Sequence, residues 1–275
     1  MNQAMVFESI LSPSEVREKS WKMFLMGLLS SSAGIALSLW VFPDNPSISV
    51  VFLTTMACIP ILVNVLKMEG GEDFSKKEFP LIGNHKDVLG VVFFLFFGLL
   101  LSFTTWYLVL PPEIKARVFS SQINTINNIN SGIQGGYIQT TYLKIILANN
   151  FKVLFFCLLF SLLYGAGAIF IIAWNASVLG TAIGNVITSN IQNALSYFHA
   201  IPIGFGQYLI HGVPEIIAYF MAGIAGGIIS AAVIRYKPRS KKFKEVLLDS
   251  IDLIILASVT LIISGLIEVF ISLGG

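Results

Sequence analysis

Charged side chains are scarce in this chain. Only 12% of its 275 residues are Asp, Glu, Lys or Arg, whereas 55% are hydrophobic. A soluble domain carries about a quarter of its residues as charges. The composition therefore excludes an ordinary soluble protein. The formal net charge of +2 says little by itself, and we expect no nucleic-acid partner.

Cysteine and the common catalytic motifs are also nearly or wholly missing. The two cysteines, Cys58 and Cys157, lie in apolar runs without the spacing of a metal site or a disulfide framework. The sequence has no Gly-x-Ser-x-Gly and no His-Glu-x-x-His motif. We therefore predict a protein that is not an enzyme and has no cofactor. A membrane-embedded hydrolase is the third-ranked alternative.

Long apolar runs occupy most of the chain. Several approach 20 residues, the length at which a helix crosses the hydrocarbon core. They predict an all-α polytopic membrane protein with about seven transmembrane helices. The fifth run is short and contains polar residues such as Asn185 and Asn190, so hydropathy alone does not establish that it crosses. The predicted spans are residues 21–42, 47–66, 89–110, 151–174, 175–191, 213–235 and 246–273.

The placement of basic residues predicts the orientation. Lys and Arg near span ends mark the cytoplasmic side. Seven crossings with a cytoplasmic N-terminus put 13 of the 17 basic residues inside, including six in residues 235–244. The four left outside are Lys115, Arg117, Lys144 and Lys152. If the fifth run did not cross, the richest basic loop would face outward, so we favour seven crossings in the cell membrane.

Three parts follow from this order of spans: a three-span module in residues 1–110, an extracytoplasmic connection in residues 111–150 and a four-span module in residues 151–275. Isoleucines recur in the connection at roughly helical spacing among Asn, Gln and Ser. This pattern is compatible with a helix lying at the membrane interface. A solvated loop with scattered isoleucines is the alternative.

Polar residues gather near the predicted outer ends of the last four spans. The predicted cluster consists of Asn149, Asn150, His211, Glu215 and Glu268. Ionisable groups inside a membrane are costly, so they normally face a bundle interior and find a partner. One interpretation is a site for a proton, a cation or a metal. The other is structural, with these groups joining the helices by hydrogen bonds.

His211 and Glu215 are the candidate metal ligands. They are four residues apart and would share a face of a continuous helix. Pro214 suits a first helical turn, and we therefore expect the helix to begin there, with His211 just outside it. Spacing fixes no third ligand, so the metal prediction stays open.

Small residues predict close helix packing. Gly180 and Gly184 form one Gly-x-x-x-Gly pair, and Gly223 and Gly227 form another. Gly165 reduces the bulk of the fourth span. We expect an internal interface of the four-span module, with a homodimer seam as the alternative. Gly204 and Gly206 are expected in a re-entrant or interfacial connection.

Several segments together resemble the stage II sporulation protein M family. They are a span opened by two asparagines (ILANNFKVLFF), a predicted hairpin around Asn175 (AWNASVLGTAIG), the segment HGVPEIIAYFMAGIAGG, and a last span with a late acid (GLIEVFIS). They occur in family order and cover about residues 143–272. The resemblance implies structural importance for Asn149, Asn150, Asn175, His211, Glu215 and Glu268, and no catalytic assignment.

The resemblance also shapes the predicted function. In sporulating members, the family's protein belongs to a membrane complex that helps organise cell-wall hydrolases during engulfment. Relatives also occur in organisms that make neither spores nor murein, so that role does not transfer automatically. We predict an integral membrane scaffold or complex component with protein partners. The alternative from another class is a transporter or channel that uses the His/Glu cluster for a cation or proton.

Overall fold

A computed structural model describes residue 16 and residues 19–69, 81–133, 139–164, 167–190 and 197–274. Within these ranges the chain forms helices and short turns, without a strand. The helices are α3 (Lys22–Val41), α4 (Pro46–Glu69), α5 (Leu81–Val109), α6 (Pro112–Val118), α7 (Ser120–Ile133), α8 (Gln139–Tyr164), α9 (Ala168–Asn190), α10 (Tyr197–Arg235) and α11 (Lys241–Gly274). The predicted all-α class is confirmed.

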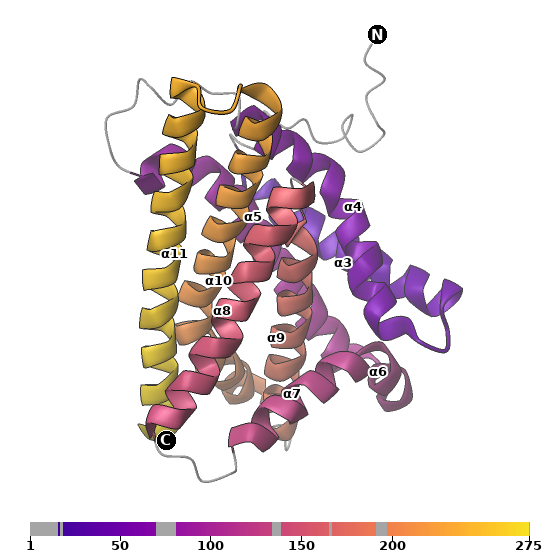
Figure 1. Cartoon of the computed structure of the whole chain (residues 1–275). Helices are drawn as coiled ribbons and strands as arrows, with labels where there is room; N and C mark the ends of the chain where they lie inside the picture. The colour runs from indigo at the N-terminus through magenta and orange to yellow at the C-terminus, as the bar shows by residue number, and fades with distance from the viewer. Residues whose placement is uncertain are drawn as a thin grey trace.

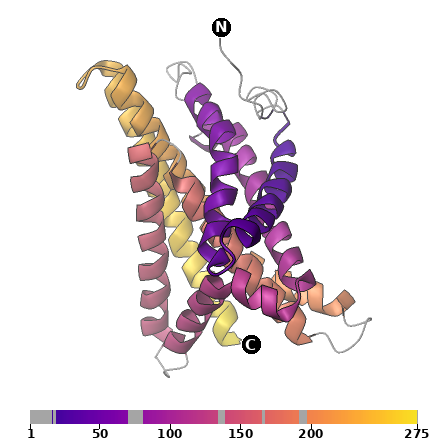
Figure 2. The ribbon, with the colours of Figure 1, turned by 90° about the vertical axis from the view of Figure 1, so that its right-hand side faces the viewer.

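Seven of these helices are long and apolar enough to cross a membrane. They are all the described helices except α6 and α7, which lie across one end of the bundle (Figures 1 and 2). Helix α10 packs against α8, α9 and α11, while α5 packs against α3 and α9. The connection between α10 and α11 projects beyond the neighbouring end of α8 (Figure 2). The predicted number of spans is thus confirmed.

The predicted boundary between the fourth and fifth spans is wrong. Helix α8 ends at Tyr164 and α9 begins at Ala168, so residues 151–174 combine the end of one helix with the start of the next. The residues between them are small and uncharged, and hydropathy does not drop there. Asn175 lies inside α9, where its side chain donates to the Ile171 carbonyl at 2.8 Å, and the hairpin prediction is corrected accordingly.

The predicted start of the sixth span is also wrong. Helix α10 runs over 39 residues and contains both Pro202 and Pro214. Gly204 and Gly206 are therefore part of a helix rather than of a connection. A proline inside a membrane helix is tolerated where a neighbouring hydroxyl satisfies the backbone near the kink. Ser264 on α11 provides such a group.

The Ser264 hydroxyl donates to the His211 carbonyl at 2.6 Å. This carbonyl lies three residues before Pro214, in the turn that the proline disturbs. The contact also fixes the antiparallel register of α10 and α11. His211 itself is inside α10, contrary to the sequence-based expectation.

Glycines set the spacing between helices. A Cβ at Gly180 would lie 2.9 Å from Phe103 Cβ, and one at Gly184 would lie 2.6 Å from Tyr107 Cδ1. This pair therefore forms an internal seam, but with α5 rather than within the predicted four-span module. The other pair lies close to α8 and α9: a Cβ at Gly223 would lie 2.9 Å from Ala168 Cβ, and Gly227 is buried. Gly165 lies outside the described residues.

Candidate functional site

Helices α8, α10 and α11 bring most of the predicted polar cluster together. Buried positions 150, 154, 157 and 161 form one stripe along α8, because they recur at intervals of three and four residues. This stripe faces α10, where Gly226 approaches the Leu158 backbone. Helix α11 packs against both of the others. Polar side chains on the three facing surfaces therefore meet inside the bundle.

Glu215 has a hydrogen-bonding partner on its own helix. The Tyr219 hydroxyl donates to Glu215 Oε1 at 2.6 Å, and Tyr219 is only 1% exposed. The two residues are four apart, so they lie on one face of α10. Sequence reasoning missed Tyr219, although this spacing was the available signal.

The two asparagines have different environments. Asn150 is 4% exposed and lies in the buried stripe of α8 that faces α10. Its Nδ2 atom nevertheless makes no hydrogen bond of acceptable geometry within the described residues. Asn149 is exposed and donates to Asn150 Oδ1 over a long 3.4 Å contact. Only Asn150 therefore belongs to the interior of the cluster.

Glu268 on α11 completes the pair of acids. It is partly buried and close enough to Glu215 for the two carboxylates, when charged, to repel each other. Within the described part of the chain, neither acid forms an ion pair with a lysine or arginine. An acid pair without a cation in a low-dielectric bundle must be neutralised or satisfied by hydrogen bonds.

His211 makes a hydrogen bond through its backbone carbonyl, whereas its ring nitrogen Nδ1 makes none among the described residues. Its Nδ1 atom is buried without a hydrogen-bonding partner among the described residues, and its ring centroid lies 6.3 Å from that of Tyr208. No group of three His, Cys, Asp or Glu residues could hold a metal ion in the described ranges. Among the described residues, His211 and Glu215 thus lack the third protein ligand that a metal site requires.

Glu215 lies farther from the start of its helix than the sequence predicts. It is 18 residues after Tyr197 and 20 before Arg235, near the middle of α10. At 1.5 Å per residue, each side of α10 extends roughly 30 Å from it. The expected helix start near Pro214, which put Glu215 in the first turn, is therefore wrong. The depth of Glu215 in the outer leaflet stays a prediction, because α10 is longer than the hydrocarbon core is thick.

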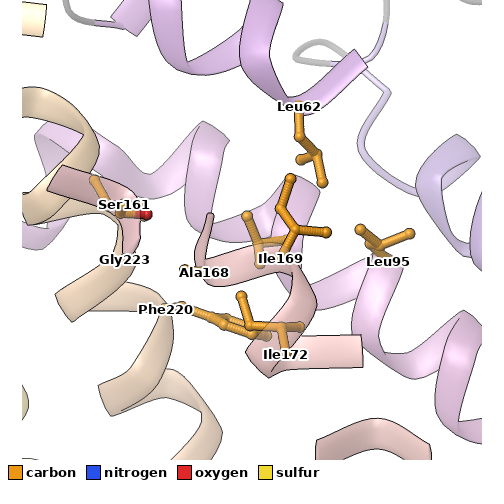
Figure 3. A pocket seen from close by; sticks show the side chains of 10 residues that line it. Leu62, Leu95, Ser161, Ala168, Ile169, Ile172, Phe220 and Gly223 are labelled. Atoms are coloured by element: carbon orange, nitrogen blue, oxygen red, sulfur yellow. The ribbon is translucent and has the colours of Figure 1, made fainter. Parts of the chain in front are cut away.

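A small apolar cavity lies one to two turns beyond Glu215 along α10. Its volume is about 30 Å³, and its lining includes Leu95, Ile169, Ile172 and Phe220 (Figure 3). Ser161 is the polar side chain in this lining. The volume is that of roughly one water molecule, and apolar cavities of this kind stay dry. The cavity does not include Glu215 or Glu268.

A second polar contact, missed by sequence reasoning, ties three segments together at the end of the bundle covered by α6 and α7. Gln122 on α7 is 1% exposed. Its Oε1 accepts from Ser47 on α4 at 2.7 Å, and its Nε2 donates to Ser177 on α9 at 3.1 Å. The helical alternative for this part of residues 111–150 is therefore confirmed.

Lys152 occupies an unexpected position. The candidate span on α8 runs over Leu143–Leu163, so Lys152 lies at its centre rather than at its outer flank, and its side chain is exposed. A lysine at a bilayer centre costs about 2.5–3.5 kcal/mol on insertion scales. No acid pairs with it among the described residues. The placement of Lys152 outside the membrane stays a prediction, because the span is defined by length and composition alone.

Comparison with known proteins supports the resemblance found in the sequence. The family model described as stage II sporulation protein M matches residues 90–273. An uncharacterized protein from Methanocaldococcus jannaschii is 27% identical over 155 residues, which cover 54% of this chain and 83% of that protein. No solved structure matches. The family match includes most of α5 and crosses the module boundary placed at residue 110.

Proposed function

The chain belongs to the stage II sporulation protein M family, and on this premise we propose that it is a non-enzymatic integral membrane scaffold or component of a membrane protein complex. The hydrogen bond from Tyr219 to Glu215 is the main support, because it gives the central acid a structural partner within its own helix. The cavity beside the cluster is too small and too apolar for a substrate.

We extend the proposal to location and orientation. The protein resides in the cell membrane with its N-terminus in the cytoplasm and its C-terminus outside. Exposed Lys237 and Arg239 lie in the connection between α10 and α11, and exposed Lys242 lies in the first turn of α11. This orientation places all three on the cytoplasmic side. The engulfment role of sporulating relatives is not part of the proposal.

The second candidate function is transport of a cation or proton. One observation favours it: Glu215 and Glu268 lie near each other inside the bundle, without a cationic side chain paired to them in the described chain. Paired intramembrane acids of this kind occur along proton and ion pathways. In this alternative, a proton or a cation would occupy the acid pair transiently.

Flux measurements separate the two candidates. The purified protein is reconstituted alone into liposomes and tested under proton, sodium and potassium gradients, beside Glu215→Gln and Glu268→Gln. The scaffold proposal expects no flux above that of empty liposomes. Flux that both substitutions abolish would overturn it and assign transport to the acid pair. Flux that neither substitution changes would also overturn it, and would place the pathway elsewhere.

A further inference from the structure

Helix α8 has one exposed side that carries two polar residues among apolar ones. We define the α8 outer face as Ile145, Ala148, Asn149, Lys152 and Phe155, all of which are exposed. Their spacing of three and four residues aligns them along one side of the helix. The opposite side contains the buried stripe that packs on α10. The outer face is therefore a separate surface, distinct from the Glu215 cluster.

The position of Lys152 distinguishes this surface from an ordinary lipid-facing one. The residue lies at the centre of the span Leu143–Leu163, about 15 Å along the helix from either end. A lysine side chain extends roughly 6 Å from the backbone, so its ammonium group reaches the membrane interface only when the residue lies near the end of a helix. With this span centred in the bilayer, its ammonium group cannot reach either headgroup region by extending along α8.

Lys152 also lacks a counter-charge within the chain. Lys144, the other charged residue of this span, is also a lysine, and no described acid pairs with Lys152. Intramembrane charges nearly always find a partner or a wet cavity. A second copy placed with its own α8 against this face would bring two lysines together, which argues against a symmetric α8–α8 contact.

We propose that the α8 outer face binds a transmembrane helix of another protein that carries a carboxylate at mid-membrane depth. The carboxylate pairs with Lys152, and the neighbouring Asn149 amide offers a second polar contact one turn away. Ala148 allows close approach of the partner backbone, as small residues do at membrane helix interfaces. The inference rests on the proposed role in a membrane complex and identifies the surface used for it.

A model peptide tests the charge recognition directly. The full-length protein, with a fluorescent donor fused to its C-terminus, is reconstituted with an acceptor-labelled transmembrane peptide of Leu and Ala. One peptide has a central Glu, and the matched peptide has Gln at that position. Energy transfer then measures the association of each peptide with wild type, Lys152→Met and Lys144→Met.

We expect wild type to bind the Glu peptide about tenfold more strongly than the Gln peptide, as one interhelical polar contact allows. Lys152→Met should remove this preference, and Lys144→Met should keep it. Equal binding of both peptides to wild type would overturn the proposal and leave the face in lipid. A preference that survives Lys152→Met would overturn the role of Lys152.

A second arm tests self-association. Donor- and acceptor-labelled copies of the protein are reconstituted together without peptide. Energy transfer between copies that Lys152→Met abolishes would overturn the proposal and make a second copy the occupant. This assay remains informative if the scaffold proposal fails, because flux through the protein and peptide preference at Lys152 are measured independently.

Discussion

Removal of the Tyr219 hydroxyl tests how the central acid is held. Tyr219→Phe keeps the ring that fills the core and deletes the donor that lies 2.6 Å from Glu215 Oε1. This distance falls in the range of hydrogen bonds from a hydroxyl to a carboxylate, about 2.5–2.7 Å. Such bonds contribute about 1.5–3 kcal/mol in soluble proteins, whereas polar contacts between membrane helices average about 0.6 kcal/mol. We expect a loss of about 1.5 kcal/mol in the free energy of unfolding.

The assay is reversible unfolding in mixed micelles by titration with a denaturing detergent, followed by tryptophan fluorescence and helical circular dichroism. Tyr208→Phe is the matched control, since the same helix carries it and no hydrogen bond of its hydroxyl is found within the described residues. The control should change the unfolding free energy by less than about 0.5 kcal/mol, as substitutions away from specific contacts do.

A double-mutant cycle shows whether Glu215 is the group that Tyr219 stabilises. In a Glu215→Gln background the acceptor is neutral, so Tyr219→Phe should cost only about 0.6 kcal/mol. The difference between backgrounds, about 1 kcal/mol, measures the coupling. Equal losses in both backgrounds would refute the reasoning, as would a loss in wild type no larger than that of Tyr208→Phe.

Three further substitutions test packing and polar contacts. Gly180→Leu should prevent close approach of α5 and α9 and abolish the monodisperse folded protein on gel filtration, whereas Gly206→Ala, whose Cβ meets nothing within 4 Å, should leave it intact. Gln122→Leu should lower the unfolding free energy by about 2 kcal/mol because it removes two buried hydrogen bonds, to Ser47 and Ser177, and exposed Asn124→Leu on the same helix should not. Ser264→Ala should cost about 1 kcal/mol by freeing the His211 carbonyl beside the proline kink, and a measured loss of zero would contradict that contact.

The number of spans was predictable because it depends on local hydropathy. Each long helix contains its own apolar window, so neither tertiary contacts nor the order of packing is needed to find it. The break between α8 and α9 was not predictable by this route. It falls in a short stretch of small, uncharged residues. Hydropathy averaged over about 19 residues stays high across such a stretch, so the average does not show where one helix ends and the next begins.

The course of α10 depends on residues far away in the sequence. Pro214 favours a helix start when only its neighbours are considered. The helix continues through it, and Ser264, fifty residues further along the chain, contacts the His211 carbonyl in the turn before the proline. The cluster around Glu215 could be assembled from the sequence, but its position along α10 could not, because that position follows from where the helix begins.

Glu215 and Lys152 are two ionisable residues of the apolar helices, and they differ in whether the chain provides a partner for them. Glu215 accepts a hydrogen bond from Tyr219, so part of the cost of placing an acid there is offset within the chain. Lys152 lies near the middle of its candidate span, yet no ion pair among the described residues offsets its cost. If both groups served only the stability of this chain, both would be satisfied within it. The contrast therefore places the acid with the contacts inside the protein, and it supports the proposal that Lys152 pairs with a carboxylate of a partner helix.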